Sequence, residues 1–199
     1  RRCQRGRYLV DSAYEIRNGG AQALAPHASF QLTRDGNAAE QGEAFGVTTF
    51  TGPAFYTDAN KFQKVSFEDI TDGDAKFAKT ASDGWVAMVQ HYFVSAWLPE
   101  QGLEREYFAR GVGNNLFSAG VILPVSAIEP GAAGTVASRL YAGPQEQDKL
   151  EAIAPGLDLV VDYGWLTVIA APLFWVLSWL HSLTGNWGWA IILLTVGIK

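Results

Sequence analysis

The sequence predicts a mainly β fold, an antiparallel sandwich over residues 1–162, followed by an uncharged tail of helical character. Two observations predict the sandwich. Turn residues recur roughly every 8–15 positions, and no long helical period occupies the runs between them. A third observation sets the tail apart, because residues 163–198 contain no Asp, Glu, Lys or Arg.

Alternation of apolar and polar residues predicts the strands in the first half of the chain. The clearest run is 7–18, in which Tyr8, Val10, Tyr14 and Ile16 share one face. Turn chemistry closes this run at Asn18-Gly19-Gly20. Further strands are predicted at residues 28–33, 46–51 and 61–70, the second of them ended by Gly52-Pro53.

The second half begins with residues 85–98, the most apolar part of the predicted domain. This run is rich in β-branched and aromatic residues, which predicts one or two strands buried on both faces. Residues 145–154 predict a short helix, because Pro144 precedes it, acidic residues lie in its first turn and Pro155-Gly156 ends it. The remaining predictions are strands at 104–109, 116–123 and 135–141 and an extended connector at 157–163.

Charge and cysteine content exclude several classes of protein. The chain has 15 Lys and Arg against 20 Asp and Glu, without a basic block, so nucleic acid is not an expected partner. Cys3 is the single cysteine, which excludes an internal disulfide. Because the chain does not begin with Met and its last apolar run is short, we expect it to be part of a longer protein.

The sequence offers little for catalysis. The three histidines are His27, His91 and His181. None has a second His or Cys at metal-ligand spacing, so we predict no metal and no cofactor. His91 could be a general base, although a packed histidine explains it more simply. No nucleophile elbow or phosphate loop is present, and we predict that the chain is not an enzyme. Aromatic residues at alternating positions could line a groove or pack in the core: Trp85, Phe93 and Trp97.

The tail holds five of the seven tryptophans, as expected at a membrane boundary, where indole prefers the headgroup level. Residues 165–183 are long enough to span a bilayer. A thin stripe of polar or small residues and the mid-segment Pro172 instead favour a helix that lies in the interface plane, with spanning as the alternative. We therefore predict an amphipathic interfacial helix at 163–184, marked by Trp165, Pro172, Phe174, Trp175, Trp179 and His181.

After a turn at Gly185–Gly188, residues 188–199 form an apolar run of about half the length that a crossing needs. We predict the start of a transmembrane helix. Lys199 would then lie inside the membrane, where a cation costs roughly 2.5–3.5 kcal/mol, and would face a polar cavity or extend to the far interface. Acidic residues dominate the flank at 141–162, which predicts that residues 1–162 lie outside the cytoplasm, in the periplasm of a bacterium.

Several motifs resemble bacterial members of the YidC/Oxa membrane protein insertase family. They are DYGWL at 162–166, PLFWVLSWLHS at 172–182, GNWGWAIILLT at 185–195, SDGWVAMVQHYFVSAWLP at 82–99 and AGPQEQDKLEAIAPGLDLVV at 142–161. The resemblance implies that the periplasmic domain is a β-supersandwich, similar in fold to sugar-mutarotase domains. It also implies an interfacial helix and the start of the first core transmembrane helix after the domain.

The resemblance further implies a protein of the bacterial inner membrane that helps to insert and fold integral membrane proteins, alone or with the Sec translocon. Implied partners are nascent membrane proteins, the Sec translocon, its SecDF accessory and the lipid bilayer. Lys199 falls where the family carries a cation, commonly Arg, in a hydrophilic substrate groove. Lysine keeps the charge but lacks the planar fork of arginine.

Two competing hypotheses remain from the sequence. The first is a carbohydrate-binding or mutarotase-like β-sandwich domain on a membrane anchor, which would need a His–carboxylate pair in a groove. The second is a simple anchor that carries a structural domain.

Overall fold

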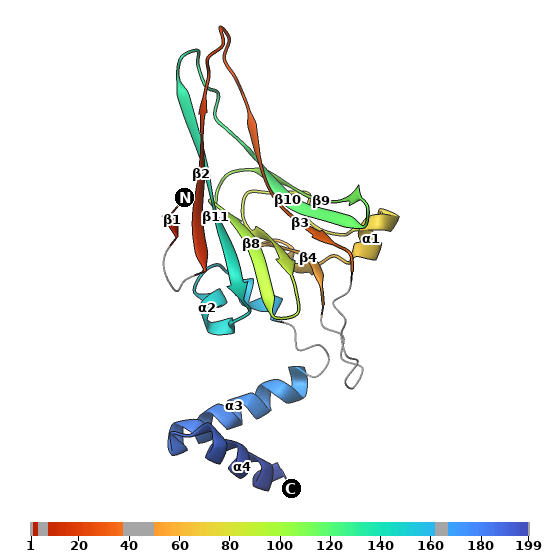
Figure 1. Cartoon of the computed structure of the whole chain (residues 1–199), viewed down its shortest axis with the longest axis vertical. Helices are drawn as coiled ribbons and strands as arrows, with labels where there is room; N and C mark the ends of the chain where they lie inside the picture. The colour runs from red at the N-terminus through yellow and green to blue at the C-terminus, as the bar shows by residue number, and fades with distance from the viewer. Residues whose placement is uncertain (1, 4–7, 38–49, 162–166, 199) are drawn as a thin grey trace. The chain divides into compact units, whose positions relative to one another are not determined.

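The computed structural model describes residues 2–3, 8–37, 50–161 and 167–198 (Figure 1). These residues fall into two compact units, each of which is described by itself. The first unit contains the described residues up to Val161 and is called the β domain. The second unit contains residues 167–198 and is called the helical unit.

Two antiparallel sheets form the β domain, which confirms the predicted sandwich (Figure 1). Neighbouring strands in the seven-stranded sheet are, in order, β1 (Arg2–Cys3), β2 (Leu9–Arg17), β11 (Ala133–Pro144), β8 (Phe93–Pro99), β7 (Trp85–Val89), β4 (Gly52–Thr57) and β5 (Lys61–Lys64). The four-stranded sheet has the order β3 (His27–Asp35), β10 (Leu116–Pro124), β9 (Arg105–Gly113) and β6 (Thr80–Ala81).

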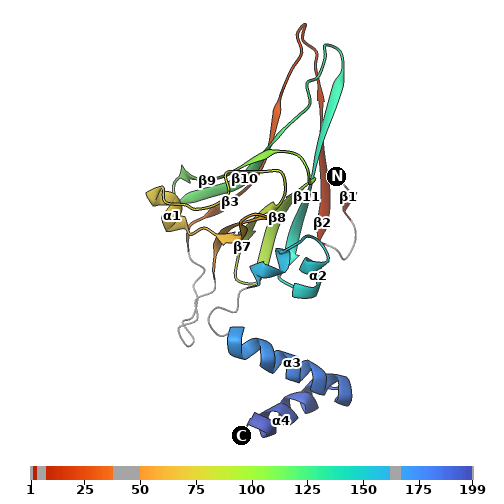
Figure 2. The ribbon, with the colours of Figure 1, turned by 180° about the vertical axis from the view of Figure 1, so that it is seen from behind.

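Apolar side chains cover both faces of the seven-stranded sheet. Alternate residues of β7 contribute to two different cores, because successive side chains of a strand point to opposite faces. Val86 and Met88 pack with residues of the four-stranded sheet such as Phe30. Trp85 and Ala87 pack on the other face. The prediction that residues 85–98 are buried on both faces is therefore confirmed for β7, whereas β8, which lies beside it (Figure 2), is fully buried on one face and exposed or half-buried at Phe93, Ser95 and Trp97 on the other.

The outer face of the seven-stranded sheet is covered by α2 (Gln147–Glu151) and the 3-10 helix η1 (Leu157–Val160). Leu150, Leu157 and Val160 are buried there against the sheet. The indole N–H of Trp85 donates to the carbonyl oxygen of Pro155 at 2.9 Å, which ties this segment to the sheet. The connection between β11 and the end of the domain is thus packed rather than free.

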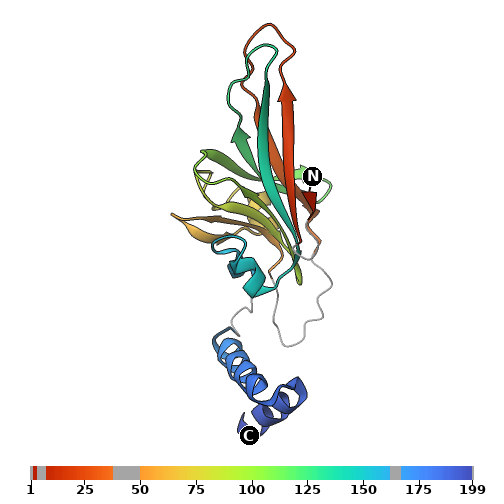
Figure 3. The same cartoon turned by 90° about the vertical axis from the view of Figure 1, so that its left-hand side faces the viewer.

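Strands β2 and β11 form one of the two longest ladders among the described strands, and they run side by side in Figure 3. Their register runs from Leu9 opposite Tyr141 to Arg17 opposite Ala133. At about 3.4 Å per residue this ladder spans roughly 30 Å, so the two ends of the domain lie far apart. The loops beyond Arg17 are joined by the bridge between Leu24 and Ile128.

Local predictions differ from the structure at four places in the domain. Gly52-Pro53 begins β4 instead of ending a strand, and residues 46–51 lie largely outside the described part. The run 61–70 is divided between β5 and the helix α1 (Phe67–Asp72). Residues 157–160 form η1, where we predicted an extended connector, because Gly156 adopts a left-handed φ of 69° that turns the chain into a 3-10 turn. The predicted helix at 145–154 is shorter, because α2 begins only at Gln147, after Glu146 at its N-cap, and ends at Glu151.

The helical unit consists of α3 (Thr167–Thr184) and α4 (Trp187–Ile198). Gly185, with a left-handed φ of 63°, ends α3. Asn186 then caps α4, because its side-chain oxygen accepts the backbone N–H of Gly188 at 2.8 Å. The predicted turn and the two apolar helices on either side of it are present, with Trp165 and Lys199 outside the described residues.

Candidate functional site

Exposed apolar side chains cover the helical unit. Ala190 is the one residue of the unit whose side chain is described as buried. A set of large apolar residues is exposed by between 37 and 70%: Leu173, Phe174, Trp175, Trp179, Leu183, Trp187, Trp189, Ile191, Ile192, Leu193, Val196 and Ile198. A water-facing surface rarely carries so many neighbouring apolar residues, so this surface is suited to an apolar environment.

The predicted interfacial residues lie in α3 with different surroundings. Trp175 and Trp179, four residues apart, are exposed by 70% and 54%, and Phe174 by 64%. Pro172 is exposed and lies inside the helix, which continues through it. His181 is half-buried and its ring stacks on Trp187 of α4, with 3.9 Å between ring centroids and 12° between planes.

Three hydroxyl groups of the helical unit donate to carbonyl oxygens of their own helices. Ser182 donates to the carbonyl oxygen of Trp179 at 2.7 Å, and Thr184 donates to that of Leu180 at 2.9 Å. Thr195 in α4 does the same with the carbonyl oxygen of Ile191 at 2.8 Å. A hydroxyl that is paired in this way needs no water, so these residues are compatible with a lipid-facing surface.

The polar stripe that the sequence predicts along α3 is therefore interrupted. Ser178 and His181 are half-buried, whereas Ser182 is exposed with its hydroxyl paired. Among the helices that the structure describes, none has both the length and the hydropathy for a bilayer crossing.

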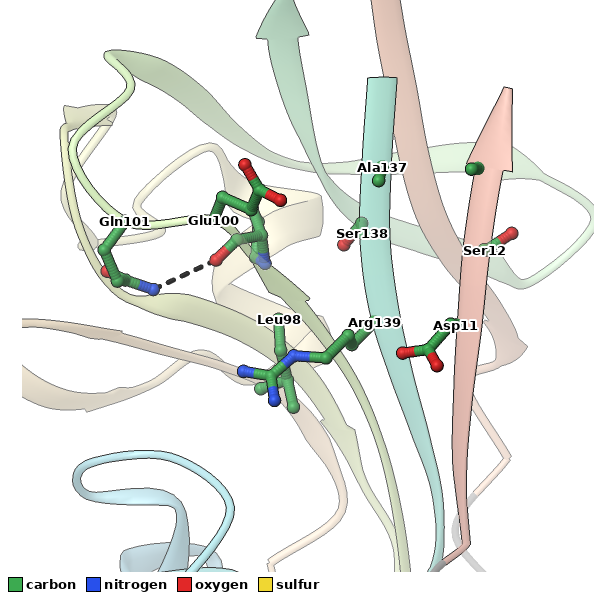
Figure 4. Close-up of a pocket in the computed structure, with 10 residues that line it drawn as sticks. Asp11, Ser12, Leu98, Glu100, Gln101, Ala137, Ser138 and Arg139 are labelled. Carbon is green, nitrogen blue, oxygen red and sulfur yellow. Dashed lines mark hydrogen bonds between the residues drawn. The ribbon is translucent and has the colours of Figure 1, made fainter. Parts of the chain in front are cut away.

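A pocket of about 610 Å³ lies in the β domain, at the point where the chain leaves the end of β8 and separates from the neighbouring strand β11 (Figure 4). Asp11 from β2, Arg139 and Ser138 from β11 and the segment Glu100-Gln101 line it. Gln101 is held by its own backbone neighbours, since its amide donates to the carbonyl oxygen of Pro99 at 3.0 Å. The Ser138 hydroxyl is buried and has no hydrogen-bond partner among the described residues.

The histidines required by the mutarotase-like hypothesis do not lie in this pocket. His27 begins β3 in the four-stranded sheet, whereas His91 lies in the turn between β7 and β8 of the other sheet. His91 packs edge-on against Tyr92 at 4.0 Å. Within the described ranges, no group of His, Cys, Asp and Glu could hold a metal ion.

The aromatic residues that could have lined a groove are separated instead. Trp85 is 2% exposed on the outer face of its sheet. Trp97 packs toward the four-stranded sheet, where its ring lies 4.9 Å from that of Phe30 and its N–H donates to the carbonyl oxygen of Gln31. Phe93 is 57% exposed at the start of β8. Two of the three thus serve the core, on opposite faces of one sheet.

Sequence reasoning missed the buried Arg105. Its guanidinium donates to the carbonyl oxygens of Leu103, Ser82 and Glu100, although the residue is only 2% exposed. Beside it, burial raises the pKa of Tyr107 to about 12, and its hydroxyl donates to the carbonyl oxygen of Asp83 at 2.8 Å. An arginine between glutamates gave no signal of burial, because such a pattern is typical of an exposed strand.

Taken together, a two-layer β sandwich and a helix pair with an exposed apolar surface define a membrane-associated β-sandwich protein. Comparison with known proteins identifies the family within this class. The chain belongs to the YidC periplasmic domain family, whose model matches residues 2–176.

Three relatives, each named membrane protein insertase YidC, illustrate the similarity. The chain is 74% identical over 195 residues to the protein of Aromatoleum aromaticum and 60% identical over 197 residues to that of Dechloromonas aromatica. It is 55% identical over 195 residues to that of Nitrosospira multiformis. In each case 98% of this chain is covered, but only 36, 36 and 34% of the relative. The chain therefore spans about a third of the length of these curated relatives.

Proposed function

We propose that this chain supplies the periplasmic domain and the membrane entry of a membrane protein insertase. Membership of the YidC periplasmic domain family supports the assignment, together with the insertase names of the relatives. On the molecule itself, the helical unit carries the proposal, because its described tryptophans are exposed and the hydroxyls of Ser182 and Thr184 are paired within α3. The function is one of positioning and partitioning, without bond chemistry.

In this proposal α3 is the interfacial helix and lies along the outer surface of the inner membrane. Trp175 and Trp179 would lie at the headgroup level, where an indole keeps its N–H hydrated while its rings are buried. The β domain would lie on the periplasmic side, in agreement with the acidic flank at 141–162. The segment from 188 onward would open the first core transmembrane helix.

The remaining proposals follow from the resemblance. Lys199 would contribute a cation to a hydrophilic groove, in which polar parts of a nascent chain are accommodated while apolar parts move into lipid. Nascent membrane proteins and the bilayer are the proposed partners, with the Sec translocon and SecDF as proposed accessory contacts. A groove of this kind needs more helices than these residues provide, so we predict that the 199-residue chain alone does not insert substrates.

Reconstitution tests the proposal directly. In liposomes that contain the complete protein, the triple variant Phe174→Ser/Trp175→Ser/Trp179→Ser should lose most insertion of a single-span substrate. The matched triple variant Leu24→Ser/Val112→Ser/Leu116→Ser, on exposed apolar residues of the β domain, should keep it. Equal insertion by both variants would contradict the proposal, and so would substrate insertion by the 199-residue chain without the rest of the protein.

A further inference from the structure

The turn between β7 and β8 presents two exposed aromatic side chains. Tyr92 is 70% exposed and Phe93 57%, the two highest values among the large apolar residues described in the β domain. The turn sequence, Gln90-His91-Tyr92-Phe93, contains no Asp, Glu, Lys or Arg. An uncharged tip with exposed aromatics would be costly on a surface that meets only water.

Hydrogen bonds hold this turn in place. The backbone N–H of Gln90 donates to the carbonyl oxygen of Phe93 at 2.9 Å. The side-chain amide of Gln145 donates to the carbonyl oxygens of Gln90 and Phe93, at 2.6 and 3.2 Å. The backbone N–H of Gln145 donates to the carbonyl oxygen of Tyr92 at 3.0 Å. The aromatic side chains are therefore carried by an ordered backbone, so little conformational entropy is lost when they bind a surface.

The turn lies at the end of the domain from which the chain departs toward α3. Val89 and Val94, which flank the turn, pack in one cluster with Leu150 and Val160. Val161 ends the domain, and five residues in sequence separate it from the start of α3. Phe93, at the start of β8, is paired with Pro144, three residues before α2 begins. A short tether of this kind gives a high effective concentration for a second contact with whatever surface α3 binds.

We propose that Tyr92 and Phe93 insert into the headgroup region of the phospholipid bilayer and form a second membrane contact of the protein. The inference rests on the proposed function, because it takes α3 to lie at the membrane surface. Aromatic side chains are suited to this level, since they combine a large apolar area with low conformational entropy. The contact is not driven by charge, because α2 and η1 carry the acidic residues Asp148, Glu151 and Asp158.

Fluorescence quenching on the 199-residue chain tests the proposal. In a Cys3→Ser background, an environment-sensitive fluorophore is attached to Tyr92→Cys, to Leu24→Cys or to Phe174→Cys. Leu24 is a matched control, because it is 43% exposed at the opposite end of the β2–β11 ladder. Vesicles of phosphatidylcholine, with and without phosphatidylglycerol, contain lipids brominated near the headgroup as quenchers.

The label at position 92 should be quenched several-fold more strongly than the label at position 24, in both kinds of vesicle. Quenching at 174 together with equal, weak quenching at 92 and 24 would overturn the inference and leave the proposed function intact. Absence of quenching at 174 would overturn both. Quenching at 92 that requires phosphatidylglycerol would show attraction by charge and would also overturn the aromatic contact. The thermal midpoint of each labelled chain confirms that the domain is folded.

Discussion

The β domain buries its largest aromatic side chains, whereas the helical unit exposes its tryptophans. Phe55 and Tyr141 are both 0% exposed, between or beside the sheets. Trp175 and Trp189 are exposed by 70 and 62% on helices of the same chain. The difference indicates two surroundings, since the same side chains gain free energy by leaving water in either case. One unit removes them from water by folding, and in the proposed function the other would do so by contact with lipid.

Polar groups follow the same division. In the β domain, a buried polar group can be paired across a long distance in sequence, as when Asn18 donates to the carbonyl oxygen of Ile128 at 2.7 Å. In the helical unit, the described hydroxyl bonds of Ser182, Thr184 and Thr195 include one to a carbonyl three or four residues earlier in the same helix. The helical unit thus needs no partner from the rest of the fold to satisfy these groups.

The largest effect on folding is expected from Phe55→Ala. Phe55 stacks on Phe77 with 4.3 Å between ring centroids and is fully buried, so its removal leaves a cavity. We expect the free energy of unfolding to fall by about 4 kcal/mol. Chemical denaturation, followed by circular dichroism, measures it. Phe174→Ala is the matched control in the helical unit and should leave the β-domain transition unchanged; an equal loss for both would remove the distinction between the units.

A smaller effect, on membrane affinity rather than folding, is expected from Trp175→Ser/Trp179→Ser. Two exposed indoles that leave water on binding contribute about 3 kcal/mol together, which corresponds to about a hundredfold in partition. Sedimentation with vesicles measures the partition, while the unfolding transition of the β domain should not move. Binding that is unchanged, or a destabilised β domain, would contradict the division.

Arg105→Lys should destabilise the β domain by about 2 kcal/mol. Lysine keeps the charge but cannot reach three carbonyl oxygens with a planar fork. Arg139→Lys is the matched control, because Arg139 is exposed in the pocket of Figure 4 and its change should cost little. Similar unfolding midpoints for both variants would show that the buried guanidinium contributes no more than a surface one.

The smallest effect is expected at the start of α1. Ser66 caps this helix, accepting the N–H of Asp69 at 3.0 Å, and Ser66→Ala should cost about 1 kcal/mol at neutral pH. Ser126→Ala, at an exposed loop position, should cost less.

The carboxylate of Asp69 adds a pH dependence to the same cap. Two hydrogen bonds hold the pKa of Asp69 below its usual value. The larger effect comes from the side chain of Ser66 and the smaller from its backbone. The contribution of Asp69 to stability is therefore present above the unfolded-state pKa of about 3.9 and is lost as the pH falls through the lower folded-state pKa. Thermal unfolding of Asp69→Asn should approach that of the unchanged protein only below about pH 4. A difference that is constant from pH 7 to pH 2 would contradict this account.

Much of the sandwich could be predicted, because alternation of polarity is a property of the strand itself. The strands around Tyr14, Phe30 and Val121 follow from their own sequences. Some of the failed predictions could have been avoided, because the local sequence contains the signal for the observed element. Ser66, with Asp69 three residues later, is a capping-box pattern that predicts α1, and Gly73 ends that helix in a left-handed conformation.

Other features depend on the folded arrangement and could not be predicted from a local pattern. Pro53 lies buried in β4, where its carbonyl oxygen accepts the N–H of Val65 at 2.9 Å, a contact between residues twelve positions apart. The stacking of His181 on Trp187 requires the turn at Gly185 to bring two helices together. For the candidate site, the apolar tail, its tryptophans and a thin polar stripe were predicted, whereas the pairing of hydroxyl groups with carbonyl oxygens of their own helix was not.

The proposed function depends most on the position of α3, which is expected to lie along the membrane surface. A nitroxide scan of positions 172–183, on the vesicle-bound chain, measures the depth of each label from its accessibility to oxygen and to a water-soluble nickel complex. We predict a depth that oscillates with a period of about 3.6 residues and stays within about 10 Å of the headgroup boundary. A depth that increases steadily along the helix toward the centre of the bilayer, or labels that are all exposed to water, would contradict it.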